Sequence, residues 1–484
     1  MNSISTPPID LGPVVPELVL VGTAILVLLG GALARRVESL GWLFVALAGV
    51  AGAAAASIAL WDRDGELTVL GGTVAADRFG VAVRLILLAS AAIGLVLGHH
   101  YFERSGEART EFYPLVLFAT SGMTLIAVAT DLILVFLALE VLSLSLYVLT
   151  GLGSRLGSIE GALKYFLLGA FSSAFFLFGV AMAYGATGST GFADVAAALT
   201  GRTDGLALAL TGLGFLAVGF AFKVSAVPFH MWTPDVYQGA PTAVTAFMSA
   251  ATKVAGFAAL MRMFNVALQP LSWDWRPIVW GLAAASVVIG SVLAIAQRDV
   301  KRMLAYSSVA HAGFVLTGLT AAGEAGISAA LYYLVAYSLT VLGAFGVVML
   351  VSSRGDRRTQ LEAYRGLGAH RPVLAGLLAL FLLSLAGIPP TAGFAAKVAV
   401  FSAAMEAGGW PLVVLGVVAS VVSAYFYLRV IVLMFMQQPV EAVETDRSWM
   451  PQILVGVPAA LVVVLGLFPG LVVGFLETAA VLQW

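Results

Sequence analysis

The chain has 484 residues, of which 61% are hydrophobic and only 11% are charged. Soluble domains contain about 45–50% apolar and about 25% charged residues, so this composition excludes a soluble protein and indicates an integral membrane protein. A net charge of −1 gives no argument for a nucleic-acid partner. Because the chain has no cysteine, it can form neither a disulfide nor a thiolate-bound iron–sulfur cluster.

Apolar segments long enough to cross a bilayer follow one another along the chain. A run of about 20 apolar residues crosses the hydrocarbon core as a helix, and by this rule we predict about fourteen spans in an all-α protein. Long continuous apolar runs exclude a membrane barrel, whose strands alternate over about ten residues. The predicted spans begin near Val15, Leu40, Gly80, Tyr113, Asp131, Gly161, Leu206, Pro241, Ile278, Arg302, Ile327, Val373, Pro411 and Ile453.

The loops between these spans are short, and the longest charged one reads SSRGDRRTQLEAYRGLGAHRP. No segment has room for a nucleotide- or flavin-binding domain. We therefore predict a single polytopic membrane domain over residues 1–484.

Lysine and arginine in the loops predict the orientation, because loops on the inner side of a membrane carry an excess of both. If the N-terminus lies outside, five cations fall in outer loops: Arg63, Arg78, Arg202, Arg262 and Arg276. A larger set then falls inside: Arg35, Arg36, Arg104, Arg109, Arg155, Arg298, Lys301, Arg302, Arg354, Arg357, Arg358, Arg365, Arg371 and Arg447. Both termini are therefore predicted outside.

A few charges lie within the apolar runs themselves. A charge near the bilayer centre costs about 2.5–3.5 kcal/mol on insertion scales, so such residues are functional candidates by default. Arg84 and Arg429 also fit a structural part, in which they reach a membrane face or clamp two helices. The set is Arg84, Glu140, Lys164, Lys223, Lys253, Lys397 and Arg429.

Lysine paired with a carboxylate suits proton transfer. Burial favours the neutral amine, whereas a nearby carboxylate favours the ammonium, so a pair that opens and closes can bind and release a proton. Two histidines, His230 and His311, lie in or beside spans and could pass protons, although a histidine in a helix bundle often serves only as a hydrogen-bonding residue.

Proline interrupts two of the predicted spans. Pro228 breaks the seventh span and Pro389–Pro390 breaks the twelfth, and both follow a small and an aliphatic residue. Proline frees backbone groups that a membrane tolerates only beside protein or a wet cavity. Because the breaks are five spans apart, the two copies would be inverted, which is the arrangement that points to an ion path in transporters.

Three sequence stretches resemble a known family. KVSAVPFHMWTPDVYQGAPTAVTAFMSAATKVAGF (223–257), RDVKRMLAYSSVAHAGF (298–314) and SLAGIPPTAGFAAK (384–397) are similar to signatures of the antiporter-like membrane subunits of respiratory complex I. MWTPDVY, together with Lys397, resembles the subunit N branch, since the M-type paralogue typically has a glutamate at the latter position.

This resemblance implies a fold of about 14 helices with two inverted five-helix repeats. Spans 1–3 would occupy residues 1–112, the first repeat (spans 4–8) residues 113–265, the second repeat (spans 9–13) residues 275–437, and the last span residues 438–484. Helices 7 and 12 would be broken, in agreement with the prolines.

The resemblance also implies a proton relay. Glu140 matches the glutamate that pairs with the seventh-span lysine, Lys223, and Lys164 matches a lysine that modulates this pair. Lys253 matches the eighth-span lysine on the central axis, and Lys397 matches the residue that leads to the outer exit. His230 and His311 match polar residues between them.

The implied function is that of a non-redox, proton-translocating subunit of NADH–quinone oxidoreductase, in the translocase class. This chain would bind no cofactor or metal, since flavin, iron–sulfur clusters and the quinone site would lie in other subunits. Its partners would be the M-type paralogue, the small membrane subunits and the lipid bilayer, and its location would be the bacterial inner (plasma) membrane.

Two other functions remain open. The shared family signatures also permit a subunit of a multisubunit cation/proton antiporter without a redox partner. Alternatively, the chain could be a scaffold with static charges, but a scaffold could use neutral residues at a lower insertion cost.

Overall fold

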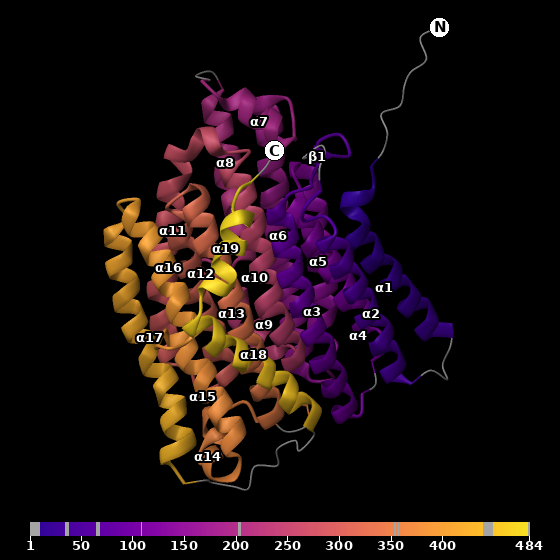
Figure 1. Ribbon diagram of the computed structural model, residues 1–484, viewed down its shortest axis with the longest axis vertical. Helices are drawn as coiled ribbons and strands as arrows, with labels where there is room; N and C mark the ends of the chain where they lie inside the picture. The colour runs from indigo at the N-terminus through magenta and orange to yellow at the C-terminus, as the bar shows by residue number, and fades with distance from the viewer. Residues whose placement is uncertain are drawn as a thin grey trace.

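The computed structural model describes residues 10–33, 38–63, 68–107, 109–201, 205–352, 355–356, 358–438 and 449–482. Over these ranges the chain forms a bundle of roughly aligned α-helices (Figure 1). Of the cations used to predict the orientation, Arg35, Arg36, Arg202, Arg354, Arg357 and Arg447 lie outside the described residues.

Four long helices form the N-terminal side of the bundle. A 3₁₀ turn, Gly12–Val14, leads into α1 (Val15–Leu33), which is followed by α2 (Ser39–Ile58), α3 (Arg78–Ser105) and α4 (Phe112–Val128). Between α2 and α3, the short strands β1 (Thr68–Val69) and β2 (Val74–Ala75) pair antiparallel, with Val69 opposite Val74.

The next group contains the first broken span. It comprises α5 (Leu132–Thr150), α6 (Leu156–Thr187), α7 (Phe192–Leu199), α8 (Leu206–Lys223), α9 (Trp232–Gly239) and α10 (Thr242–Asn265). The seventh predicted span is thus two helices, α8 and α9.

The last group contains the second break. A 3₁₀ turn (Gln269–Leu271) precedes α11 (Ser272–Ile295), α12 (Val300–Leu319) and α13 (Gly323–Val351). A second 3₁₀ turn (Leu361–Tyr364) leads to α14 (Leu367–His370), α15 (Pro372–Ala386), α16 (Ala392–Glu406), α17 (Trp410–Met436), α18 (Trp449–Leu467) and α19 (Gly470–Ala479). The twelfth predicted span is likewise two helices, α15 and α16.

Length and composition fit a protein that crosses a membrane many times. Within the described ranges, ten helices are long and apolar enough to span, or eleven if α18 and α19, bent by 86°, count as one. The helices α4 and α15 are apolar but shorter. The multi-pass prediction is confirmed, whereas the number of fourteen stays a prediction.

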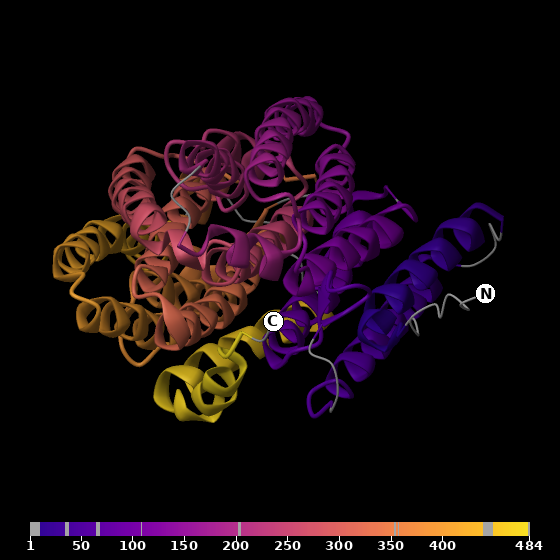
Figure 2. The same ribbon diagram turned by 90° about the horizontal axis from the view of Figure 1, so that it is seen from above.

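The two ends of the bundle differ in what they hold. In Figure 1 the hairpin and α7 lie at one end, the α7 end, and α14 lies at the opposite one, the α14 end. Seen along the bundle, α1 and α2 stand at one side and α17 at the other, with α18 and α19 along one face (Figure 2).

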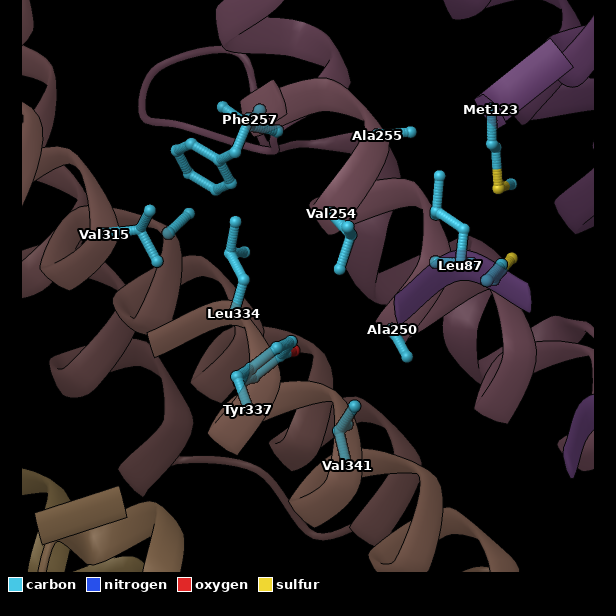
Figure 3. Packing of buried hydrophobic residues seen from close by; sticks show 14 of the residues in the cluster. Leu87, Met123, Ala250, Val254, Ala255, Phe257, Val315, Leu334, Tyr337 and Val341 are labelled. Atoms are coloured by element: carbon cyan, nitrogen blue, oxygen red, sulfur yellow. The ribbon is translucent and has the colours of Figure 1, made fainter. Parts of the chain in front are cut away.

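The centre of the bundle is formed by α10 and α13. Every residue of α10 up to Phe264 is buried. Figure 3 shows the apolar packing between α10, through Ala250 and Val254, and α13, through Leu334 and Val341. By contrast, α5 and α6 expose rows of large apolar side chains such as Leu144 and Phe171, as expected of a lipid-facing surface.

Glycine allows one helix pair to approach very closely. A Cβ atom added at Gly290 of α11 would lie 2.5 Å from the backbone nitrogen of Ala310 in α12. A Cβ atom at Gly313 of α12 would lie 2.7 Å from the backbone nitrogen of Val287. Small residues commonly allow such close helix contacts in membrane proteins.

Aspartates anchor the starts of α5 and α12 in a matching way. Asp131 accepts hydrogen bonds from the first turn of α5 and from Thr190 Oγ1 (2.6 Å), and forms an isolated β-bridge to Gly191. Asp299 caps α12, accepts from the Thr359 hydroxyl and forms an isolated β-bridge to Gln360. The same local arrangement therefore occurs in both halves, at opposite ends of the bundle.

Candidate functional site

The first break exposes backbone carbonyls at the end of α8. The helix ends at Lys223, and Pro228 follows before α9 begins. The buried Lys253 ammonium on α10 donates a hydrogen bond to the carbonyl oxygen of Val224. Lys253 therefore binds at the C-terminus of a half-helix.

The second break is occupied in the same manner. The buried Lys397 Nζ donates to the carbonyl oxygens of Ala386 (2.8 Å) and Leu385 (3.2 Å), at the end of α15. The same ammonium lies 4.7 Å from the centre of the Phe314 ring. Both breaks thus place a lysine against the carbonyl end of a broken helix.

This placement follows from the electrostatics of a helix end. The last carbonyls of a helix have no partner within the helix, and the C-terminus carries a partial negative charge. An ammonium donates up to three hydrogen bonds, so it satisfies these carbonyls and gains from the helix dipole. The carbonyl end of a broken helix can therefore hold a lysine ammonium inside the bundle without a carboxylate partner.

Lys223 and Glu140 lie near one another but do not form a direct ion pair among the described residues. Lys223 Nζ donates to Ser143 Oγ on α5 (2.9 Å), while Glu140, one turn away on α5, accepts from Ser173 Oγ of α6. A cavity of about 20 Å³, lined by Lys223, Ser143 and Ser173, lies at this point and is large enough for about one water molecule.

Lys164 lies apart from this pair. Its ammonium is 2.9 Å from Asp235 on α9 and 2.7 Å from Glu160, and Asp235 also binds Arg302 at 2.5 Å. Lys164 and Asp235 line a cavity of about 290 Å³, which we call the inner pocket. The structure thus places Lys164 at the α14 end, where it does not contact Glu140 or Lys223.

His311 lies between the two carbonyl-bound lysines. Its ring nitrogens are 2.7 Å from the Tyr333 hydroxyl and 3.3 Å from the Tyr427 hydroxyl. Its ring is within electrostatic range of both Lys253 and Lys397. His230, in the first break, is within range of Lys253 as well. Glu140, Lys223, Lys253, Lys397 and the two histidines therefore form a series across the bundle.

Several partners in this series were not predicted from the sequence. Ser143 accepts from Lys223 and Ser173 donates to Glu140, while Tyr333 and Tyr427 contact His311. Serine and tyrosine are common in membrane helices, so residue type alone does not mark these four residues as partners. A signal did exist for Ser143, since it follows Glu140 at the three-residue spacing that places two side chains on one helix face.

Lys301 also differs from its prediction. It was counted among the cations of an inner loop, yet its side chain is fully buried, with Nζ 2.6 Å from the Ala240 carbonyl oxygen and 3.4 Å from Asp356. That prediction assumed a solvated loop. Asp356, which follows α13, is instead buried and contacts Lys301.

Asp356 gathers donors from five segments of the chain. Its carboxylate accepts from the Thr242 backbone N–H at 2.9 Å. Burial raises the pKa of Asp356, but Lys301, Arg155 and Thr242 outweigh it and lower the pKa below its ordinary value. The remaining donors are Tyr101, Arg155, Lys301 and Ser352. Asp356 is therefore ionised at neutral pH.

Among the described residues, no three His, Asp or Glu side chains converge as metal ligands.

Comparison with known proteins assigns the chain to a family. Residues 129–423 match the family described as NADH:quinone oxidoreductase/Mrp antiporter, transmembrane. NADH-quinone oxidoreductase subunit N of Acidothermus cellulolyticus is 46% identical, over 97% of this chain and 95% of its own length. The chain belongs to the subunit N family of NADH-quinone oxidoreductase.

Solved structures agree with this membership. A chain of respiratory complex I from Thermus thermophilus with bound aureothin matches with a TM-score of 0.80 and 38% identity, over 95% of this chain and 98% of that one. A chain of the Mrp complex from Dietzia sp. DQ12-45-1b matches with a TM-score of 0.82 but 22% identity, over 97% of each chain, and so shows the fold alone. The subunit N prediction is confirmed.

Proposed function

We propose that this chain translocates protons as the subunit N of a bacterial NADH–quinone oxidoreductase. The observation that carries this proposal is the pair of buried lysines, Lys253 and Lys397, each held on the carbonyl end of a broken helix, with His311 between them. Because the acceptors of these ammonium groups are neutral carbonyl oxygens, each lysine can release its proton without leaving a buried carboxylate unpaired.

The proposed relay begins at Glu140 and Lys223. Movement of Glu140 toward Lys223, with one water between them, stabilises the ammonium, and movement away favours release of its proton. The proton then passes by way of His230 to Lys253, and by way of His311 to Lys397. Lys164 acts on the first pair through the charge of the network around Asp235.

A cavity at the α7 end supports an exit beyond Lys397. It has a volume of about 450 Å³ and is lined by Glu324, Glu406 and Glu477. The helix that carries Lys397, α16, continues to this cavity and contributes Ala399, Ala403 and Glu406 to its wall. These carboxylates would attract a proton released by Lys397.

We further propose fourteen spans and two inverted repeats. The matching Asp131 and Asp299 anchors, five predicted spans apart and at opposite ends of the bundle, support this inversion. The cation distribution favours an outward α7 end, which would put both termini outside. The partners would be the neighbouring antiporter-like and small membrane subunits, and the redox cofactors would reside in other subunits.

A cation/proton antiporter subunit is the alternative, and the fold shared with the Mrp chain supports it. Co-purification separates the two functions. A tagged chain that brings flavin and iron–sulfur subunits supports the redox pump, whereas a stable complex without them supports the antiporter.

The test of the relay is Lys223→Ala in the intact complex. We expect loss of proton pumping and of coupled NADH:quinone turnover in membrane vesicles, with normal assembly on a native gel, because the first proton carrier is removed. Arg429→Ala is the control, since Arg429 is also a spanning cation bound to carbonyl oxygens, Ile295 and Gln297, but lies outside the series. Normal pumping in Lys223→Ala would contradict the relay.

A further inference from the structure

The turn between α9 and α10 brings two unlike helix ends together. The last carbonyls of a helix carry a partial negative charge, whereas the first N–H groups of a helix carry a partial positive charge. Lys301 Nζ lies 2.6 Å from the Ala240 carbonyl oxygen at the end of α9. The Thr242 N–H at the start of α10 donates to Asp356 at 2.9 Å, and Asp356 is 3.4 Å from Lys301. One buried ion pair therefore satisfies both helix ends.

Arg155, at the start of α6, binds the same turn from another side. Its guanidinium donates to the Gly239 carbonyl oxygen at 3.4 Å, and to the backbone and side-chain oxygens of Asp356 at 3.0 and 3.4 Å. Asp356 thus lies between two cations, both of which bind the carbonyl end of α9. We call Arg155, Lys301 and Asp356 the α9 clasp.

Asp356 itself is fixed by parts of the bundle outside this turn. Its carboxylate accepts from the Tyr101 hydroxyl of α3 and from the Ser352 hydroxyl that follows α13, each at 3.2 Å. Its φ angle is 55°, in the left-handed region that favours glycine, asparagine and aspartate. The clasp therefore fastens α9 to α3 and to the end of α13.

The helix α9 depends on contacts of this kind for its position. It has only eight residues and is separated from α8 by the break at Pro228. Isolated helices shorter than about 12 residues are marginal in water, so a helix of this length is held by the rest of the protein. Close packing adds to the clasp, because a Cβ atom at Gly239 would collide with the Gly157 carbonyl oxygen of α6.

The position of α9 sets two parts of the proposed relay. Asp235 on α9 lies 2.9 Å from Lys164 and 2.5 Å from Arg302. The helix begins two residues after His230, which lies within electrostatic range of Lys253. A displacement of α9 would therefore change both of these interactions.

We propose that Asp356 is a positioning residue, which holds α9 through the clasp and thereby sets the positions of Asp235 and His230 in the relay. The inference rests on the proposed function. It gives a residue of the second half of the chain control over the broken helix of the first half. Asp356 passes no proton in this scheme, so its effect is exerted through the placement of α9.

The first test is Asp356→Asn in the intact complex, followed by hydrogen–deuterium exchange. Asparagine tolerates the positive φ angle and still accepts from the Thr242 N–H, but it has no charge to hold Lys301 and Arg155. We expect amide exchange in α9 to rise several-fold, with exchange in α5 unchanged, because only α9 loses its fastening. Unchanged exchange in α9, or an equal rise throughout the bundle, would overturn the positioning role.

The matched control is Glu362→Gln, which removes one negative charge from the same connection between α13 and α14. Glu362 is exposed, so this variant should keep normal exchange in α9, normal proton pumping and normal coupled turnover. Against this control, we expect Asp356→Asn to lower proton pumping and coupled turnover several-fold.

A second variant covers the case in which Asp356→Asn does not assemble. Removal of one partner leaves the Lys301 ammonium buried and unpaired, whereas Asp356→Asn/Lys301→Met removes both charges together. This double variant should assemble, with raised exchange in α9 and reduced pumping, since the Ala240 carbonyl has lost its ammonium. Exchange in α9 equal to that of Glu362→Gln would overturn the proposal.

The Lys223→Ala variant distinguishes the two proposals. If Lys223→Ala abolishes pumping but the clasp variants pump as well as Glu362→Gln, the relay stands and the positioning role fails. If Lys223→Ala pumps normally, the proposed function fails, and the positioning role fails with it even where exchange in α9 is raised.

Discussion

At the scale of single residues, the buried cations of this chain differ in their partners. Arg84 binds Glu17 through two hydrogen bonds of 3.0 and 2.9 Å, and Arg262 binds both oxygens of Asp77 at 2.7 and 2.8 Å. Among the described residues, Lys253 and Lys397 donate hydrogen bonds to backbone carbonyls and to no carboxylate. An arginine in a carboxylate pair is fixed in charge and position, whereas a lysine on neutral oxygens can lose its proton.

Arg84→Leu should reduce the amount of assembled complex, because it leaves the Glu17 carboxylate buried and unpaired. Removal of one partner of a buried pair costs about 3–5 kcal/mol. The measurement is the quantity and thermal stability of the solubilised complex. The Arg84→Leu/Glu17→Leu double variant should recover much of the loss. A fully assembled but inactive Arg84→Leu complex would instead give Arg84 a part in the relay.

The sequence pointed to Glu140, Lys223, Lys253 and Lys397 because a charge within an apolar run is conspicuous. The sequence could not show which groups bind these residues, because every residue has a backbone carbonyl. Only the folded structure shows which carbonyls a helix break leaves free. The sequence prediction also missed Asp356, because an acidic residue in a charged loop resembles a solvated one.

At the scale of helices, most spans were predictable because each needs a long apolar run. The beginnings of α1, α8 and α15 lie within a residue of their predicted positions, whereas α6 and α11 begin several residues earlier than predicted. Polar first turns extend a helix beyond the lipid, so hydropathy underestimates its length. The short helix α7 and the hairpin were missed because neither crosses the membrane.

Gly290→Ala should separate α11 from α12 and lower the amount of assembled complex. The new methyl group would lie 2.5 Å from backbone atoms that cannot move away without shifting a helix. Gly281→Ala is the matched control on α11, because no atom lies within 4 Å of the added Cβ there. Native gels of both variants measure the effect. Equal assembly would show that the two helices tolerate separation.

At the scale of the whole molecule, the bundle has chemically distinct ends. The α14 end holds the Lys164–Asp235–Arg302 network and the Lys301–Asp356 pair, and the α7 end holds a cavity lined by glutamates. In the proposed relay, orientation in the membrane therefore decides which end would take up protons.

Cysteine labelling tests the orientation, since the natural chain has no cysteine that would react. Ala407→Cys, in an exposed turn at the α7 end, should react with an impermeant maleimide in intact cells. Ser154→Cys, in an exposed turn at the α14 end, should react only after the membrane is opened. The reverse pattern would invert the proposed topology.

The burial of α10 from Thr242 to Phe264 has a consequence for how the chain is made. A helix that contacts no lipid in the finished protein, and that carries Lys253 and Arg262, is a poor candidate to remain in the bilayer alone when it leaves the ribosome. The helix that it contacts most, α13, is synthesised later. We therefore expect the first half of the nascent chain to form an incompletely folded intermediate. Folding would be completed only when the second half has been synthesised and packs against α10.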